Sequence, residues 1–400
     1  MSLEQTINKM LQDPEYIRFY EWTKAIQVDA THSLEHFTWE RFKYWNELIL
    51  QLKKDNTYEK FDNKMQHIAS SAFRVKIENV ANWLLRKSKE TNPKNAIEIL
   101  DNYNTSEKMT LYVIMTIMSI SSNSEYSFSN KVTINSGGYN KKFSQDMLLD
   151  GIQSSIPRPN ISSVFAFPVE KEILHTDDTY QEEVKKDEDY EIALEKINDV
   201  KDCLILSRGL GGVHTMAHKY LIPDDIPLVS TASGSAWAFE TFYLPTIGSP
   251  FITIEELNEA NRILERYELL DEKMRKSIHV SIERLNGYCS SSNIIERAVN
   301  IRICLESIFL KGDESNEIAN TLALRTSRLT AQTLEERKEK YKLIKECYSL
   351  TSKAVHRGNI PDKKIKNISK LDEVAELARK VIILKIENGK EFDWKEIELN

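Results

Sequence analysis

The sequence is poor in glycine and proline, the residues that most often interrupt regular secondary structure. It has 12 glycines and 10 prolines in 400 residues, while 41% of the residues are hydrophobic and 29% are charged. This composition is typical of a soluble, helix-rich globular protein. The length allows two or three domains with a sizeable core.

Cysteine is also scarce. The chain has four cysteines, Cys203, Cys289, Cys304 and Cys347, and it has no C-x-x-C pair. This spacing argues against a zinc knuckle and against a redox-active pair. Free thiols fit a reducing compartment, so we expect a cytoplasmic protein.

Three further absences narrow the class of protein. The stretch "MSLEQTINKM" lacks the basic-then-apolar pattern of a signal peptide. The longest apolar run, "MTLYVIMTIMSI" at 109–120, is shorter than the roughly 20 residues that span a bilayer, so it predicts a buried helix and no membrane partner. The formal net charge of −7 excludes a global basic field, so any nucleic-acid site must be a local patch.

Hydrophobic periodicity predicts a mainly α fold with two parts. Residues 1–250 are expected to form a variable, mostly helical region with short strands around 125–240, where Ser, Asn and Gly interrupt short alternating runs. Residues 251–400 are expected to form an antiparallel helical bundle, because apolar residues recur there at helical spacing. A capping-box pair, Thr253 and Glu256, marks the start of its first helix.

Local patterns predict several individual elements. Aromatic residues between Tyr16 and Trp45 recur at helical spacing, which indicates a stripe that faces the core. The stretch "DCLILSRGLGGVHTMAH" at 202–218 predicts a buried strand, a glycine turn and the start of a helix. In the second half, further helices are expected at about 293–311, 315–331, 334–357 and 370–388.

One motif is typical of a metal site. "HSLEH" places His32 and His36 one helical turn apart with Glu35 between them, which is the inverted zinc-protease arrangement. On a helix, both imidazoles would share a face and could hold Zn²⁺ while Glu35 acts as the base. The motif needs a third ligand on a later helix, and nothing in the sequence singles one out. We therefore expect a partly exposed helix face without metal or cofactor, and keep a zinc hydrolase as a minor alternative.

A single histidine marks the end of the predicted helix 334–357. Within "YSLTSKAVHRGN", His356 lies in the last turn, next to Lys353 and Arg357, and a glycine and a proline follow as stop signals. The negative end of the helix dipole favours the imidazolium form of a histidine there. A proton-holding imidazole suits acid–base chemistry on a phosphodiester, whereas the alternative is a histidine that only caps carbonyl groups.

Four segments of the C-terminal half follow one another in a familiar order. They are Cys304–Leu305–Glu306 with Ile308, Leu322 to Arg325, Glu335 to Lys338, and Tyr348 to His356. Over about 120 residues, these segments resemble the motifs of the Apea-like branch of the HEPN (higher eukaryotes and prokaryotes nucleotide-binding) domains, in the family's order. The resemblance implies an all-helical bundle that commonly pairs, and many members are metal-independent ribonucleases of toxin, abortive-infection or antiphage systems.

The resemblance also implies a site of the form R-x-x-x-x-H. The family histidine falls on His356, but the family arginine falls on position 351, where this chain has Thr351. An arginine would supply a forked cation for the phosphate, and threonine has no charge. Lys353 or Arg357 could supply the cation in place of the family arginine. Arg325 or Arg328, in the predicted helix 315–331, could also supply it.

Two functions therefore stay open. The first is an endoribonuclease whose activity is weakened or lost at Thr351, acting on RNA as a homodimer that brings two copies of His356 to one phosphate. The second is a non-catalytic module that binds RNA, a nucleotide or a protein partner encoded in the same operon. The substrate RNA and the role of residues 1–250 cannot be read from the sequence.

Overall fold

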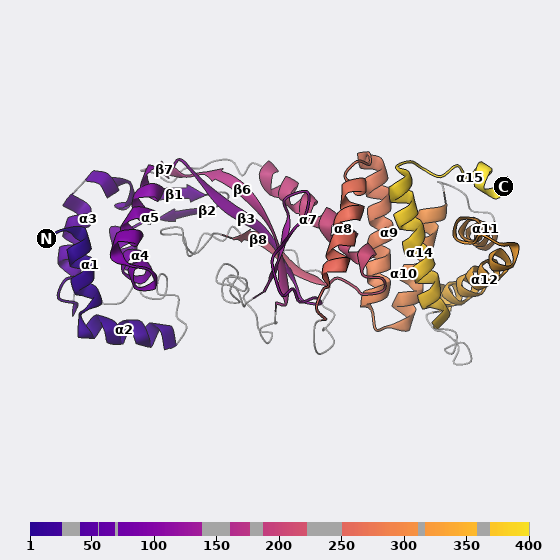
Figure 1. Cartoon of the computed structure of the whole chain (residues 1–400), viewed down its shortest axis with the longest axis horizontal. Helices are drawn as coiled ribbons and strands as arrows, with labels where there is room; N and C mark the ends of the chain where they lie inside the picture. The colour runs from indigo at the N-terminus through magenta and orange to yellow at the C-terminus, as the bar shows by residue number, and fades with distance from the viewer. Residues whose placement is uncertain are drawn as a thin grey trace.

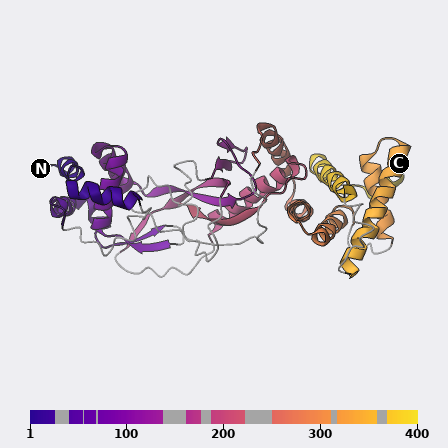
Figure 2. The same cartoon turned by 90° about the horizontal axis from the view of Figure 1, so that it is seen from below.

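The fold is mainly α with a smaller antiparallel β part, as the sequence predicts. The computed structural model describes residues 1–25, 41–54, 56–68, 71–137, 161–176, 187–221, 250–310, 317–357 and 369–399. Figure 1 shows an elongated molecule with N-terminal helices at one end, sheets in the middle and C-terminal helices at the other end. Figure 2 shows the same order after a turn of 90°.

The N-terminal helices bury the aromatic stripe that the sequence predicts. Tyr16, Phe19 and Phe42 are all buried, and the rings of Tyr16 and Phe42 meet edge to face with their centroids 5.6 Å apart. Large apolar side chains of this kind stabilise a small helical layer by leaving water together. The helical elements here are α1 (Leu3–Leu11), α2 (Pro14–Ala25), α3 (Trp45–Lys54), the 3₁₀ turn η2 (Asn56–Phe61), α4 (Ile77–Glu90) and α5 (Pro93–Thr105).

Two antiparallel sheets form the middle of the molecule. The smaller has the strand order β2-β1-β7, and the larger has the order β4-β5-β6-β3-β8. The strands are β1 (Met65–Ile68), β2 (Ser71–Arg74), β3 (Lys108–Ile117), β4 (Tyr126–Ser127), β5 (Thr133–Ser136), β6 (Ser163–Glu172), β7 (Leu174–Thr176) and β8 (Thr215–Leu221). The antiparallel pairing of β4 with β5 confirms short strands in the Ser- and Asn-rich stretch after residue 120.

The prediction of a buried helix at 109–120 is wrong, because most of this run is the central strand β3. β3 pairs with β6 on one side and with β8 on the other. Its side chains alternate between two apolar clusters: Val113 belongs to the main core and Ile114 to a smaller cluster on the other face. A strand buried on both faces reads as a continuous apolar run, which hides its period of two. In the described part of the chain, no helix has the length and apolar character needed to cross a bilayer.

The prediction of a buried strand followed by a helix start at 202–218 is also wrong. Residues 202–207 end helix α7 (Glu188–Ser207), which packs against β3 and β6. Gly209 follows Arg208, the C-cap residue of α7, and its φ of +64° is the left-handed conformation that glycine adopts freely just after a helix end. Strand β8 then begins at Thr215. The apolar run resembles a buried strand because it is the buried end of a helix whose first turn is acidic.

The four helices expected at 293–311, 315–331, 334–357 and 370–388 are confirmed, with bounds that differ by at most a few residues. They are α10 (Ile294–Phe309), α11 (Ile318–Thr330), α12 (Leu334–Arg357) and α14 (Ser369–Asn388). The same part of the chain also contains α8 (Ile254–Tyr267), α9 (Glu272–Ser290) and the short α15 (Trp394–Leu399). The capping box at Thr253 and Glu256 is present at the start of α8. The division at residues 250 and 251 stays a prediction, since 222–249 lie outside the described residues.

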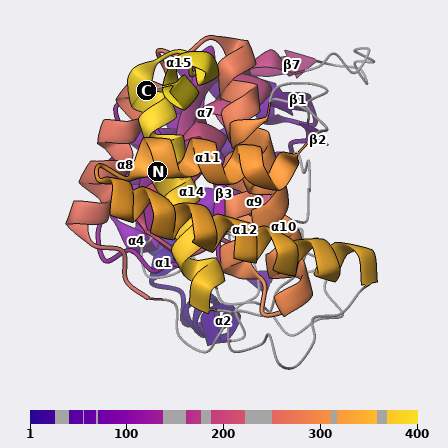
Figure 3. The ribbon, with the colours of Figure 1, turned by 90° about the vertical axis from the view of Figure 1, so that its right-hand side faces the viewer.

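The C-terminal helices pack in two directions. α9 lies against α10, and α14 lies against both α9 and α10. α11 and α12 form a second pair that lies across these helices, as Figure 3 shows. α12 therefore contacts α10, α11 and α14, and its buried side chains include Ile344, Cys347, Leu350 and Thr351.

A histidine–carboxylate pair joins the β part to the bundle. His279 of α9 lies with Nδ1 2.5 Å from Oδ2 of Asp202, which belongs to α7 and is buried. Nε2 of His279 is 3.4 Å from Oε1 of Glu283. Both carboxylates favour the charged imidazolium, and together they raise the pKa of His279 to about 10 against burial, which acts in the opposite direction. The charge on the imidazolium offsets part of the cost of burying Asp202.

We expect the free energy of unfolding to fall as the pH rises above neutral. Because the pKa of His279 is raised on folding from its ordinary value of 6.5, its contribution is fully present below pH 6.5 and is lost as the pH approaches 10. Urea unfolding at a series of pH values measures this. His279→Gln should flatten the profile. A native profile that is flat from pH 7 to 10 would contradict the assignment.

Candidate functional site

The end of α12 carries the residues that the sequence singles out. The backbone of Lys353, His356 and Arg357 forms the last turn of α12, which ends at Arg357. The predicted helix 334–357 is therefore confirmed with its C-terminal end in place. The side chains of these three residues lie outside the described part of the structure, as do the residues that follow up to 368.

Thr351 is packed inside the bundle. Its side chain belongs to the buried face of α12, and the residue is only 2% exposed. Its hydroxyl donates a hydrogen bond to the carbonyl oxygen of Tyr348, 3.0 Å away in the same helix. The hydroxyl is thus satisfied locally, and position 351 presents no charge to a ligand.

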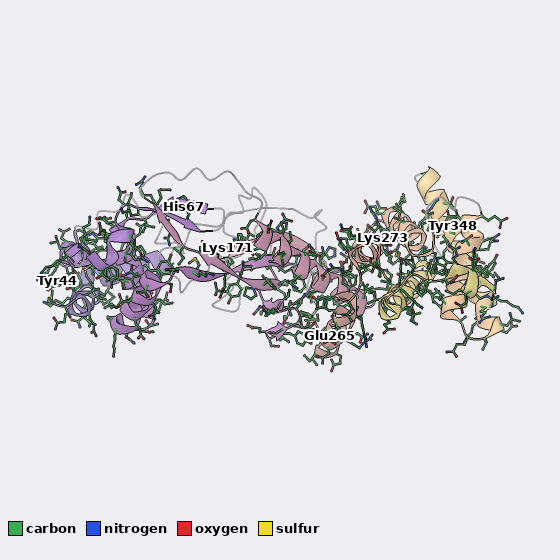
Figure 4. All side chains as sticks on the ribbon, turned by 90° about the horizontal axis from the view of Figure 1, so that it is seen from above. Tyr44, His67, Lys171, Glu265, Lys273 and Tyr348 are labelled. Carbon is green, nitrogen blue, oxygen red and sulfur yellow. The ribbon has the colours of Figure 1, made fainter. Side chains whose placement is uncertain are left out.

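An arginine, a glutamate and a tyrosine meet one turn before Thr351. Arg302 of α10 donates from Nε to Oε1 of Glu306 at 2.8 Å, and its guanidinium carbon lies 4.9 Å from the ring centroid of Tyr348. The hydroxyl of Tyr348 donates to the same oxygen of Glu306 at 3.1 Å. Figure 4 labels Tyr348 among the C-terminal helices. Its helix α12 packs against α10.

The electrostatics of this cluster keep the phenol of Tyr348 neutral. Burial and the neighbouring carboxylate of Glu306 raise the pKa of Tyr348, while Arg302 opposes them. Tyr348 therefore stays a hydrogen-bond donor at neutral pH. Nη1 of Arg302 is enclosed and has no hydrogen-bond partner in the described part of the chain. No sequence pattern points to Arg302, because it lies 46 residues before Tyr348 and meets it only in the folded bundle.

Arg325, one of the possible replacement cations, is committed to the fold instead. It is buried, its Nε lies 2.6 Å from Oε1 of Glu398, and its Nη1 donates to the carbonyl oxygen of Phe309. The guanidinium also lies over the ring of Trp394, 4.8 Å from the centroid. Arg328 donates weakly to the carbonyl oxygen of Glu398 at 3.5 Å. Both arginines hold α15 against α11.

The histidine motifs give no metal centre within the described residues. His32, Glu35 and His36 lie in 26–40, outside the described residues. His218 lies on strand β8, and its Nδ1 forms a hydrogen bond of 2.6 Å with the hydroxyl of Tyr190. Across the ranges that the structure describes, no group of three or more His, Cys, Asp or Glu side chains is arranged to hold a metal ion.

Comparisons with protein-family models, with curated proteins and with solved structures found no match to this chain.

Replacing Arg325 should weaken the fold and leave ligand binding unchanged. Arg325→Met removes the ion pair with Glu398 and the hydrogen bond to Phe309, and we expect a loss of about 1–3 kcal/mol in the free energy of unfolding. Denaturant unfolding followed by circular dichroism measures this. The matched control Arg328→Met, with its single long hydrogen bond, should lose less than about 0.5 kcal/mol. Equal losses for both variants would show that the Arg325 contacts contribute nothing specific.

Proposed function

We propose that this chain is a HEPN-like protein that acts on RNA through the end of α12. The observation that carries the proposal is the order of residues from Tyr348 to His356 on the last turns of a helix that ends at Arg357. This placement puts a histidine at a helix C-terminus, where the dipole favours a held proton. A homodimer, a cytoplasmic location, an operon-encoded protein partner and a role in phage defence belong to the same proposal.

Cleavage at this site would use protons and no metal. RNA cleavage needs a base for the 2′-hydroxyl, an acid for the leaving 5′-oxygen and a cation for the charge that develops on the phosphate. Two copies of His356, one from each protomer, would supply the base and the acid. The cation is the missing component, since position 351 holds a buried, neutral Thr351. We therefore propose a ribonuclease whose activity is weak.

A non-catalytic module is the second candidate, and the packing of Thr351 favours it. The hydroxyl of Thr351 is bonded within its own helix and its side chain fills space in the core. A residue used in this way contributes to stability and leaves the phosphate without a fixed cation. The same bundle surface would then bind RNA, a nucleotide or a protein partner without cleaving anything.

Restoring an arginine at position 351 distinguishes the two candidates. We expect Thr351→Arg to raise RNA cleavage by about 10²–10³-fold, because it supplies a cation for the transition state. Position 351 is five residues before His356, about 7.5 Å along the helix axis, which an arginine side chain can span. A labelled-RNA assay in EDTA measures the rate, and the products should carry a 2′,3′-cyclic phosphate.

Two matched variants control for packing and for proton transfer. Thr351→Met adds bulk without charge and reports the cost of overpacking, about 1–3 kcal/mol. The double variant Thr351→Arg, His356→Ala should lose the gain, since a guanidinium cannot transfer the protons. A folded Thr351→Arg protein that binds RNA and does not cleave it would make the non-catalytic module the better reading.

A further inference from the structure

Arg302 has more hydrogen-bonding capacity than its neighbours use. A guanidinium has five N–H donors, and the hydrogen bond from Nε to Glu306 uses one of them. Nη1 has no hydrogen-bond partner in the described part of the chain, but it is enclosed and not open to a ligand, whereas the Arg302 side chain as a whole is 17% exposed. Glu306 is shared, because it also accepts from the hydroxyl of Tyr348. The cluster is thus rich in donors, and both its hydrogen bonds to Glu306 end on one carboxylate oxygen.

The position of the cluster relates it to the end of α12. Tyr348 is eight residues before His356, a little over two helical turns, which is about 12 Å along the axis. Thr351 lies between them and is buried, so it offers no contact to a ligand. A strand that runs along the end of α12 would pass from His356 to the Arg302 and Tyr348 pair. This separation is too long for both to hold one phosphate, so Arg302 would contact a flanking one.

We propose that Arg302 binds a phosphate of the RNA strand that flanks the phosphate at His356, with Tyr348 donating its hydroxyl to the same strand. A guanidinium fork matches two phosphate oxygens, and a tyrosine stacked against it keeps its plane fixed. Glu306 occupies the site in the absence of RNA and would give way to the phosphate. This inference rests on the proposed action on RNA and adds a residue that places the strand.

The competing explanation is an ordinary ion pair along one helix. Arg302 and Glu306 are four residues apart on α10, and such pairs contribute about 0.3–0.5 kcal/mol to a helix. The two explanations differ in sign at Glu306. If the pair is only structural, Glu306→Gln leaves RNA affinity unchanged. If Glu306 competes with phosphate, Glu306→Gln tightens RNA binding, because it removes a negative charge and frees the guanidinium.

The test is the salt dependence of binding to a single-stranded RNA oligonucleotide, measured by fluorescence anisotropy on the full chain. Arg302→Met keeps the aliphatic bulk and removes the charge. Losing one phosphate contact should reduce the magnitude of the slope of log affinity against log salt by about 0.7. When the salt falls from about 1 M to about 0.1 M, the variant should therefore gain about fivefold less affinity than the native protein. Arg302→Lys should keep the slope, and Glu306→Gln should tighten binding.

Two further variants keep the result interpretable. Arg284→Met removes an exposed arginine on α9 and should leave the slope at its native value. If Arg302→Met alone unfolds, the double variant Arg302→Met, Glu306→Gln leaves no unpaired carboxylate and should show the same reduced slope. A native slope in folded Arg302→Met protein overturns this inference and leaves the action on RNA standing. A native protein that binds no RNA at low salt overturns both.

Discussion

The packing of the last turns of α12 against α10 is the constraint on which the candidate site depends. Cys347 and Thr351 are buried on one side of the helix, so their positions fix the rotation of α12 about its axis. That rotation brings Tyr348 onto the guanidinium of Arg302. A different rotation would expose Thr351 and separate the tyrosine from its partners, because side chains in a packed core cannot shift independently. The same contacts that hold the bundle together therefore decide which groups a ligand can meet.

Charge balance inside the bundle follows one pattern. Three arginines each form an ion pair with a carboxylate. The distances are 2.5 Å from Nη2 of Arg297 to Oδ1 of Asp372, 2.8 Å from Nε of Arg302 to Oε1 of Glu306, and 2.6 Å from Nε of Arg325 to Oε1 of Glu398. Each guanidinium is partly buried, and a partner carboxylate offsets the cost of removing it from water. The pairs differ in what else they touch. The Arg325 pair anchors the terminal helix, whereas the Arg302 pair lies at the helix that carries His356 and shares its carboxylate with a tyrosine.

The helices of the second half could be predicted from sequence because their apolar residues keep one period over many turns. α12 was predicted with both of its ends, and the capping box at Thr253 was legible from two residues. β3 could not be recognised, because a central strand with apolar clusters on both faces shows no alternation. The last turn of α7 could not be recognised for a related reason, since a short buried run is too short to show a helical period.

Only part of the candidate site could be predicted from the sequence, for a different physical reason. His356 and Thr351 are neighbours on one helix, so their relation is encoded in their spacing. Arg302 and Tyr348 come together through the crossing of α10 and α12, which no local pattern encodes. Arg325 shows the same limit. Its charge and its position in a family motif suggested a ligand-binding cation. Only the structure shows that it is buried and donates to Phe309 and Glu398 within the fold.

A neutral residue at position 351 also changes what the bundle can evolve or be made to do. Thr351 stabilises by filling space, so an arginine there must carry its charge out of the core along its aliphatic chain to reach solvent. The charged guanidinium of Arg302 lies against the ring of Tyr348 on the same helix, and it forms an ion pair with Glu306. Under the proposed function, a cation on the neighbouring helix could thus hold RNA even though position 351 carries no charge. Binding needs a cation near any phosphate of the strand, whereas cleavage needs one at the phosphate that reacts. In the function proposed above, RNA binding and RNA cleavage would therefore depend on different residues of the same bundle.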